Sequence, residues 1–222
     1  MLASASAPHS MAKTTVLPVK RAAKRVRRRL ADRREQLLDL GRALFNERSY
    51  DEISIDDIAA AAGMSKGLLY HYFPSKRRFY VEGVRAAAAH MLELVVPADF
   101  SLPAIDRLRI GVDRYLDYVE ANARAYSTLF RSGIGVDPEV STIIEATRAS
   151  ILERIVQGIG EAVSPLVALS LRGWIGMVEA ASLEWIDPRT KPKGVSRAAL
   201  RDVLVTAAQA LVVSAMQRSA DG

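Results

Sequence analysis

Apolar side chains recur at helical spacing along most of this chain, and neither an alternating strand pattern nor an internal repeat is present. In the segment 32–48, Leu37, Leu40, Leu44 and Phe45 form one apolar stripe, with charged side chains beside it. The same period marks segments 76–96, 104–121, 122–131, 139–163, 165–186 and 196–216, which turn residues separate. With two short helices between 54 and 73, the pattern predicts an all-α fold of about nine helices.

The two short helices are joined by a tight glycine turn. Ser54 is a good N-cap for the first helix, with Asp56 and Asp57 in its first turn, where the helix dipole favours negative charge. Gly63 ends this helix, because the residue after a helix end often needs a positive φ, and Ser65 caps the next one. This arrangement is typical of a helix-turn-helix.

The second short helix combines inward and outward side chains. Leu69 and Phe73 face a core, whereas Lys66, Tyr70 and His71 are long and polar-tipped. That mixture suits a helix with one face in a core and the other against DNA. A helix-glycine-helix turn inside an ordinary all-helical protein, with the tyrosines in its core, is the alternative.

The run from Ile58 to Lys76, IAAAAGMSKGLLYHYFPSK, resembles the DNA-binding signature of the TetR (tetracycline-repressor-like) family of bacterial regulators. The resemblance covers roughly residues 34–81, and the rest of the chain is similar to that family only in length and helical layout. It implies DNA contacts, mostly to phosphate, by Ser54, Ser65, Lys66, Gly67, Leu68, Tyr70, His71, Tyr72 and Lys76. Lys66 is the candidate for guanine O6 and N7.

Four positions depart from that signature. Leu68 stands where the family often has a small or polar residue, so it either touches a thymine methyl or contributes packing. Tyr72 stands where histidine is frequent, so a hydroxyl would make the phosphate bond. Arg77 and Arg78 add positive charge where an acid is common, at a place where phosphates could be met.

Charge is uneven along the 222 residues. Residues 1–90 hold 17 Lys and Arg against 9 Asp and Glu, whereas residues 91–222 hold 14 against 16. The basic end therefore coincides with the helix-turn-helix, as expected of a DNA-facing end. We expect a disordered basic arm at 1–31, a DNA-binding domain at 32–78 and a helical effector-binding and dimerisation domain at 79–222.

The basic arm contains the run Arg27-Arg28-Arg29. We expect these arginines to contact DNA, through the phosphate backbone or the minor groove, adding salt dependence rather than base choice. A solvated tail, or the early part of a longer first helix, is the alternative.

The last helix is apolar nearly all round, and small residues accompany it in the helix before. A helix of this kind must be buried on every side, so we expect its outer side to meet a second copy of the chain. A fully enclosed core helix is the alternative. The resemblance also implies a two-fold dimer built on the last two helices, with recognition helices about 34 Å apart.

The larger domain should contain a ligand pocket, since the resemblance implies a sensed small molecule. Aromatic and small inward residues are its candidate lining, although each could be plain core: Tyr115, Tyr126, Phe130, Thr147, Ile151, Trp174 and Met177. This lining favours a small hydrophobic effector. An effector would shift the population between two settings of the fourth helix and so release DNA.

Other classes of function find little support in the sequence. The three histidines have no cysteine or metal-ligand spacing beside them, and no glycine-rich phosphate loop is present, so we expect neither an enzyme nor a cofactor. No apolar run approaches the roughly 18 residues of a membrane span, and the absence of cysteine fits the cytoplasm. We expect a ligand-responsive repressor on a palindromic operator; a sequence-tolerant architectural DNA-binding protein is the alternative, and a ligand-binding helical protein with vestigial DNA contacts is a third.

Overall fold

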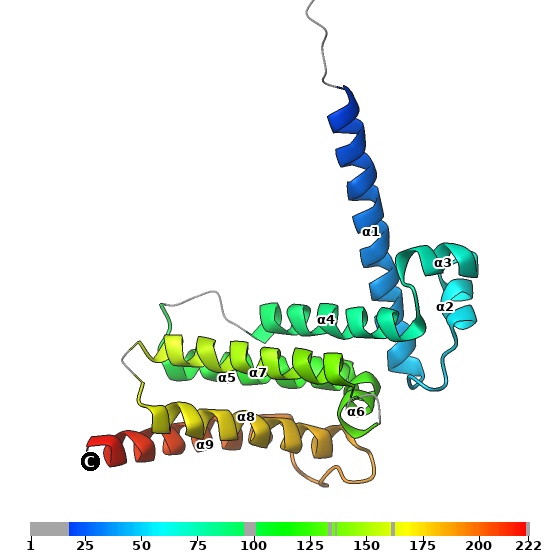
Figure 1. The fold of residues 1–222 in the computed structure, drawn as a ribbon. Helices are drawn as coiled ribbons and strands as arrows, with labels where there is room; N and C mark the ends of the chain where they lie inside the picture. Colours follow the sequence, from blue (N-terminus) through cyan, green and yellow to red (C-terminus); the bar gives the residue numbers. More distant parts are fainter. Residues whose placement is uncertain (1–17, 96–100, 133–134, 136, 161–162, 221–222) are drawn as a thin grey trace, which may run out of the picture. The chain divides into compact units, whose positions relative to one another are not determined.

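The computed structural model describes residues 18–95, 101–132, 135, 137–160 and 163–220, with the side chains of 18–27 and 220 left out. The described residues form nine helices and no strand, which confirms the all-α expectation (Figure 1). The helices are α1 Pro18–Glu47, α2 Ile55–Ala61, α3 Lys66–Tyr72, α4 Lys76–Val95, α5 Ala104–Ala121, α6 Ala123–Arg131, α7 Pro138–Ile159, α8 Pro165–Ile186 and α9 Arg197–Ala220.

The first helix is longer than we expected. The chain divides into two units, residues 1–37 and residues 38–222, and the boundary falls within α1. Residues 18–31, which we assigned to a disordered arm, are helical, so the alternative of a longer first helix is the correct one for them. Alanine, lysine and arginine are strong helix formers, and Pro18 stands at the helix start, where its missing N–H is not needed. Residues 1–17 of that arm lie outside the described part.

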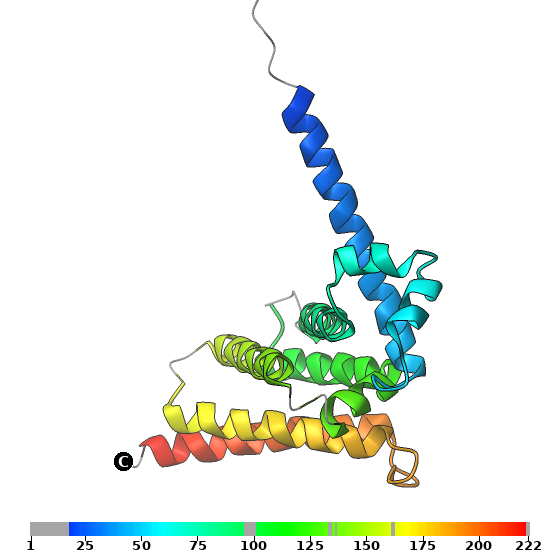
Figure 2. The same cartoon turned by 45° about the vertical axis from the view of Figure 1, so that its right-hand side comes forward.

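Aromatic side chains join the short helices to the start of α4. The ring centroids of Phe73 and Phe79 are 4.9 Å apart, and those of Phe45 and Tyr80 are 5.0 Å apart, both edge-on. Gly41 of α1 makes room for this contact, because a Cβ there would lie 2.6 Å from Phe79 Cζ. The ends of α1 and α3 therefore both meet the start of α4. Helices α2 and α3 pack on each other, and Figure 2 shows them close together.

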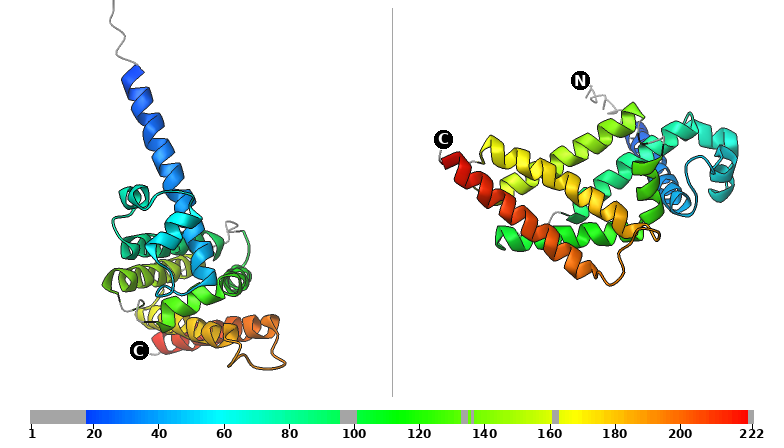
Figure 3. Two further views of the ribbon diagram at one scale, coloured as in Figure 1. Left: turned by 90° about the vertical axis from the view of Figure 1, so that its right-hand side faces the viewer. Right: turned by 90° about the horizontal axis from the view of Figure 1, so that it is seen from below.

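The remaining helices form a layered bundle. Helix α4 packs on α5 and α7, α9 packs on α5 and α8, and α7 packs on α8 (Figure 3). The main core of this bundle takes its buried residues from α4, α5, α6, α8 and α9: Met91, Val112, Tyr115, Leu116, Val119, Tyr126, Trp174, Ile175, Val178, Leu204, Val205 and Ala208. Trp174 Nε1 donates a 2.8 Å hydrogen bond to the carbonyl of Leu204, which joins α8 to α9 within this core.

Local signals set the ends of the long helices. Ser164 Oγ accepts a hydrogen bond from the N–H of Val167, and Pro165 follows at the first helical position, where its missing N–H is not needed. Helix α7 ends at Ile159 and not near residue 163, because Gly160 takes a φ of 79°. Its beginning is capped by Asp137, whose Oδ1 accepts from the N–H groups of Glu139 and Val140.

The last two helices lie side by side and are strongly apolar (Figures 1 and 3). Contrary to our expectation, both are long and apolar enough to cross a membrane by length and composition, a test that core helices of other proteins also pass. Only 33% of the apolar stretch of α8 and 22% of that of α9 are buried within the single chain. Each helix therefore keeps apolar surface that calls for a further cover.

Candidate functional site

Side-chain caps hold the turn between α2 and α3. Ser54 Oγ accepts from the N–H of Asp57 (3.1 Å), and the N–H of Ser54 donates to the Asp57 carboxylate (2.7 Å), forming a capping box. Gly63 takes a φ of 61°, and Ser65 Oγ accepts from the N–H of Leu68 (3.2 Å) as α3 begins. These features confirm the helix-turn-helix inferred from the sequence.

Helix α3 has one buried and one open face. Leu69 and Phe73 are fully buried, whereas Leu68 and Tyr70 are 48% and 42% exposed. Of the other expected contact residues, Ser54, Ser65, Lys66, Gly67 and His71 are exposed, and Tyr72 and Lys76 are half-buried. The open face of α3 is therefore accessible to a partner.

Several of these polar groups already have intramolecular partners. Lys66 Nζ lies 2.9 Å from an Asp56 carboxylate oxygen, and that hydrogen bond raises the pKa of Lys66. The Ser54 hydroxyl donates to Asp57 (2.6 Å), and this bond, with Arg48, lowers the pKa of Asp57 to about 2. Any contact of Lys66 or the Ser54 hydroxyl with DNA must therefore exchange an existing bond.

The three arginines that we expected to contact DNA from the basic arm belong to α1. Arg28 and Arg29 are exposed on α1, and the Arg27 side chain lies outside the described residues. Lys76, at the start of α4, places its ammonium 4.2 Å from the centroid of the Tyr50 ring. Positive charge is thus available at both α1 and α4.

Arg77 and Arg78, which we expected near phosphates, pair with the start of α7. Arg77 holds Asp137 bidentately, with Nε 2.6 Å and Nη2 2.8 Å from its two oxygens. Arg78 Nη1 lies 2.8 Å from Glu139, and Arg78 Nη2 lies 2.7 Å from Glu82. The first turns of α4 and α7 are therefore joined by ion pairs, which sequence reasoning missed because they link residues about 60 positions apart.

A cavity of about 630 Å³ is lined by residues of α4 to α9 and by Arg42 and Phe45. Six of the seven expected lining residues are on its wall, namely Tyr115, Tyr126, Phe130, Thr147, Ile151 and Trp174. The expectation for Met177 needs correction: it is 38% exposed, because Trp174, Ile175 and Val178 define the inward side of α8. Helix α4 contributes Val84, Ala87, Ala88 and Met91 to the same wall.

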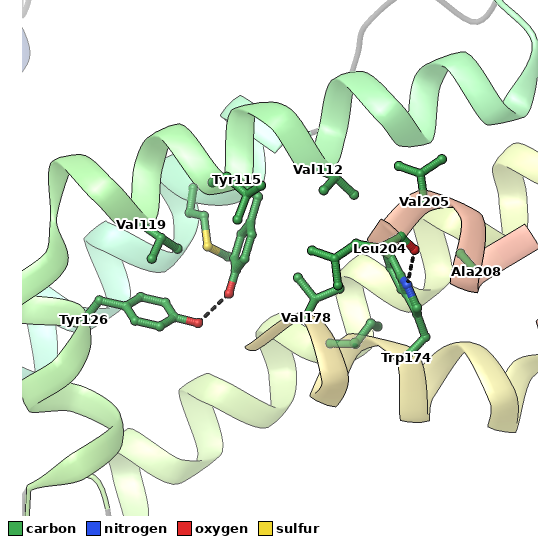
Figure 4. Close-up of a cluster of buried hydrophobic side chains, with 12 residues drawn as sticks. Val112, Tyr115, Val119, Tyr126, Trp174, Val178, Leu204, Val205 and Ala208 are labelled. Carbon is green, nitrogen blue, oxygen red and sulfur yellow. Dashed lines mark hydrogen bonds between the residues drawn. The ribbon is translucent and has the colours of Figure 1, made fainter. Parts of the chain in front are cut away.

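The cavity wall contains a small polar cluster. The hydroxyls of Tyr115 and Tyr126 are hydrogen-bonded to each other, and Figure 4 shows the two side chains directed toward one another. Burial raises the pKa of both. Arg148 Nε donates to both carboxylate oxygens of Glu179, at 2.9 Å and 3.1 Å. Sequence reasoning missed this ion pair, although Glu179, an acid among the apolar residues of α8, was a signal for it.

In the described part of the chain, no three His, Asp or Glu side chains come together at a spacing that could bind a metal ion. The features described so far that can hold a partner are the open face of α3, the cavity, and the exposed apolar surface of α8 and α9.

Two family models match the chain. Residues 37–82 match the model described as "Bacterial regulatory proteins, tetR family". Residues 105–211 match the model described as "Tetracyclin repressor-like, C-terminal domain". The first match covers α2 and α3, and the second covers most of the helices that line the cavity.

Individual proteins resemble it as well. A tetR-family transcriptional regulator from Streptomyces coelicolor is 32% identical, with a TM-score of 0.76 over 85% of this chain and 83% of that one. The HTH-type transcriptional activator FasR of Mycolicibacterium smegmatis is 30% identical over 120 residues, which are 53% of this chain and 55% of FasR. The negative transcriptional regulator IcaR of Staphylococcus aureus is 29% identical over 63 residues, 28% of this chain and 34% of IcaR. These matches to curated relatives thus span about half, or a third, of the relatives' lengths.

Proposed function

The chain belongs to the TetR family of bacterial transcriptional regulators, and from this premise we propose that it binds a palindromic operator as a homodimer and is released by a small hydrophobic effector. Members of this family are DNA-binding regulators and not enzymes. A regulator of this kind works where the chromosome is, in the cytoplasm. The observation that carries the proposal is that one helix, α4, both follows the recognition helix after three residues and lines the cavity.

DNA recognition is assigned to the open face of α3 and the residues beside it. The exposed Lys66, Tyr70 and His71 can enter a major groove, while Ser54 and the backbone N–H groups at the start of α3 can meet phosphate. Lys76 and the arginines of α1, including Arg27, would add phosphate contacts. Base edges then specify the site, and phosphates position the protein on it.

The homodimer is assigned to α8 and α9. Their large exposed apolar side chains are Leu166, Leu169 and Met177 on α8, and Val203, Leu211, Val213 and Met216 on α9. Gly173 and Gly176 on α8 have open space where a Cβ would be, so another helix can approach closely. A two-fold contact through this face would present two copies of α3 to successive major grooves.

The effector is assigned to the cavity. Its volume of about 630 Å³ lies in the range of small-molecule sites, and most of its wall is apolar. We retain Tyr115, Tyr126, Phe130, Thr147, Ile151 and Trp174 as its proposed contacts.

Release of DNA would follow from a change in the setting of α4. The effector can act only through a difference in its affinity for the two settings. Three contacts would let α4 and its neighbours respond to a displacement of the cavity helices. Two are the ion pairs of Arg77 with Asp137 and of Arg78 with Glu139, and the third is the 3.0 Å hydrogen bond from Asn46 Nδ2 to Asn122 Oδ1. A displacement of α7 or α5 by the effector would thereby reach the residues next to α3.

We propose that the protein represses transcription. The two curated relatives differ in this respect, because FasR is an activator and IcaR is a negative regulator.

Selection of bound sequences from a random DNA library, followed by affinity at two salt concentrations, tests the DNA-binding part. We expect a palindromic site and loss of binding in Tyr70→Ala and Lys76→Ala. Recovery of no motif, with steeply salt-dependent binding, would instead favour an architectural protein driven by its basic helix.

A reporter gene downstream of the selected site tests the sign. Expression that falls when the protein is present indicates repression, and expression that rises indicates activation. Saturating binding of a cavity ligand without a change in operator affinity would contradict the release mechanism.

A further inference from the structure

The wall of the cavity is apolar except for a few places, and one of them brings together polar side chains from four helices. Tyr115 comes from α5, Tyr126 from α6, Arg148 from α7 and Glu179 from α8. The two hydroxyls share a hydrogen bond, and both interact electrostatically with the ion pair. Ser182 completes the group: it is fully buried, and its hydroxyl donates to the carbonyl of Val178 at 2.7 Å.

Such a cluster is not needed to hold the bundle together. Replacing a buried ion pair with apolar residues of similar volume is often neutral or stabilising, and paired hydroxyls can be replaced by apolar groups at little cost. The side chains of Arg148 and Glu179 are only 22% and 16% exposed, so their desolvation is substantial. We propose that the paired hydroxyls of Tyr115 and Tyr126 bind a neutral oxygen, a carbonyl or hydroxyl, on an otherwise apolar effector; this rests on the proposed function.

The chemistry of the cluster selects a neutral group. Arg148 is held bidentately by Glu179 and also pairs with Glu145, which in turn pairs with Arg172 at 2.8 Å, so the charges are balanced. A carboxylate entering here would lose its hydration without meeting a net positive charge. Both hydroxyls are protonated at neutral pH, and burial raises the pKa of both tyrosines further. The bond between them uses one of the two protons, which leaves the other for an acceptor.

Arginines elsewhere on the wall define the competing outcome. Arg107 donates to the carbonyls of Leu102 and Gly158, and Arg154 donates to the carbonyl of Leu92 at 2.9 Å. A carboxylate bound at these two arginines would make the effector an acid and leave the tyrosine pair outside its recognition.

The experiment measures displacement of the fluorescent probe N-phenyl-1-naphthylamine from the full chain at neutral pH. Three competitors of one chain length are compared: 2-decanone, 1-decene and decanoate. We expect 2-decanone to displace the probe at about a tenfold lower concentration than 1-decene, the value of one hydrogen bond to a buried donor.

The key variant is the double substitution Tyr115→Phe with Tyr126→Phe, since it removes both hydroxyls together and leaves neither without its partner. We expect it to bind 1-decene as the wild type does and to lose the preference for 2-decanone. Tyr118→Phe is the matched control, because Tyr118 also lines the cavity but bonds to the carbonyl of Ala87 at 3.4 Å. It should keep the preference.

Each remaining result has a definite meaning. Equal displacement by 2-decanone and 1-decene in the wild type overturns the inference even if the double variant does not fold. Stronger displacement by decanoate that persists in the double variant also overturns it and places the polar group at Arg107 and Arg154. A preference for 2-decanone that depends on the tyrosines, without any effect on operator binding, supports this subsite and contradicts only the release mechanism.

Discussion

A polar side chain of α3 already has an intramolecular partner in the free protein. Lys66, the candidate for a guanine contact, forms an ion pair with Asp56, yet the two side chains are 48% and 67% exposed. Exposed pairs of this kind contribute little to stability, so giving one up on binding is inexpensive. Asp56 therefore orients Lys66 in the free protein without preventing it from reaching a base edge.

Lys66→Ala distinguishes a base contact from a phosphate contact. If Lys66 donates to guanine, the change should weaken binding to the selected operator by about 1–3 kcal/mol and relax the preference at one base pair per half-site. The measurement is fluorescence anisotropy on the operator and on single-base variants of it. Asp56→Asn is the control, and it should leave the base preference intact. A uniform loss on every sequence, with a salt slope smaller by about 1, would make Lys66 a phosphate anchor instead.

At the scale of elements, the features that depend on neighbouring residues were predicted better than the contacts between residues far apart in the sequence. The caps at Ser54 and Ser65 and the turn at Gly63 depend on neighbours within a few residues, and all three were anticipated. The start of α1 was misjudged because a charge-rich run with few large apolar residues looked disordered, although the alanines, lysines and arginines that make up most of it favour a helix.

The candidate sites divide in the same way. Inward periodicity identified six cavity residues, but it placed Met177 on the wrong side of a helix that is apolar nearly all round. The link between Arg77 and Asp137, and the pair of Arg148 and Glu179, join separate helices. Pairing of this kind depends on how helices pack, which a single sequence without a repeating pattern does not specify.

The ion pair between α4 and α7 yields a prediction that separates Arg77 from its neighbour Lys76. Because Arg77 is neutralised by Asp137, Arg77→Ala should leave the salt slope of operator binding unchanged, whereas Lys76→Ala should reduce it by about 1. The measurement is operator affinity across a series of salt concentrations. An equal reduction by both variants would mean that Arg77 exchanges Asp137 for a phosphate on the DNA.

The same pair gives a pH dependence. Arg77 lowers the pKa of Asp137, so the pair stabilises the fold above the ordinary aspartate pKa of about 4 and is lost as the pH falls through the lowered value. Asp137→Asn should therefore lower the melting temperature by several degrees at pH 7, and the difference from wild type should vanish near pH 2. Asp39→Asn is the control, since Asp39 pairs with Arg42 of the same helix and should have little effect at either pH.

At the scale of the whole molecule, the apolar face of α8 and α9 requires a cover. A membrane would suit their length and composition, but these helices also carry the core contacts of the bundle, including Trp174 and Leu204. The second copy that we propose would cover the outer side while leaving those contacts in place. Two linked recognition helices also gain from effective concentration, which raises affinity by about 10²–10⁴ over one alone.

Val203→Glu and Leu169→Glu test this cover, because these side chains are 65% and 69% exposed in the single chain and a charge there tolerates water but not an apolar partner. Each variant should sediment as a 24.3 kDa monomer where the wild type sediments at twice that mass. Affinity for the palindrome should fall by about 10²-fold or more, while affinity for a single half-site should be unchanged.

Ala146→Glu, a charge at an exposed position of α7, is the control and should remain dimeric. If both face variants stay dimeric, the interface lies elsewhere. If the wild type is monomeric and binds neutral lipid vesicles, the face meets a bilayer and the homodimer must be abandoned.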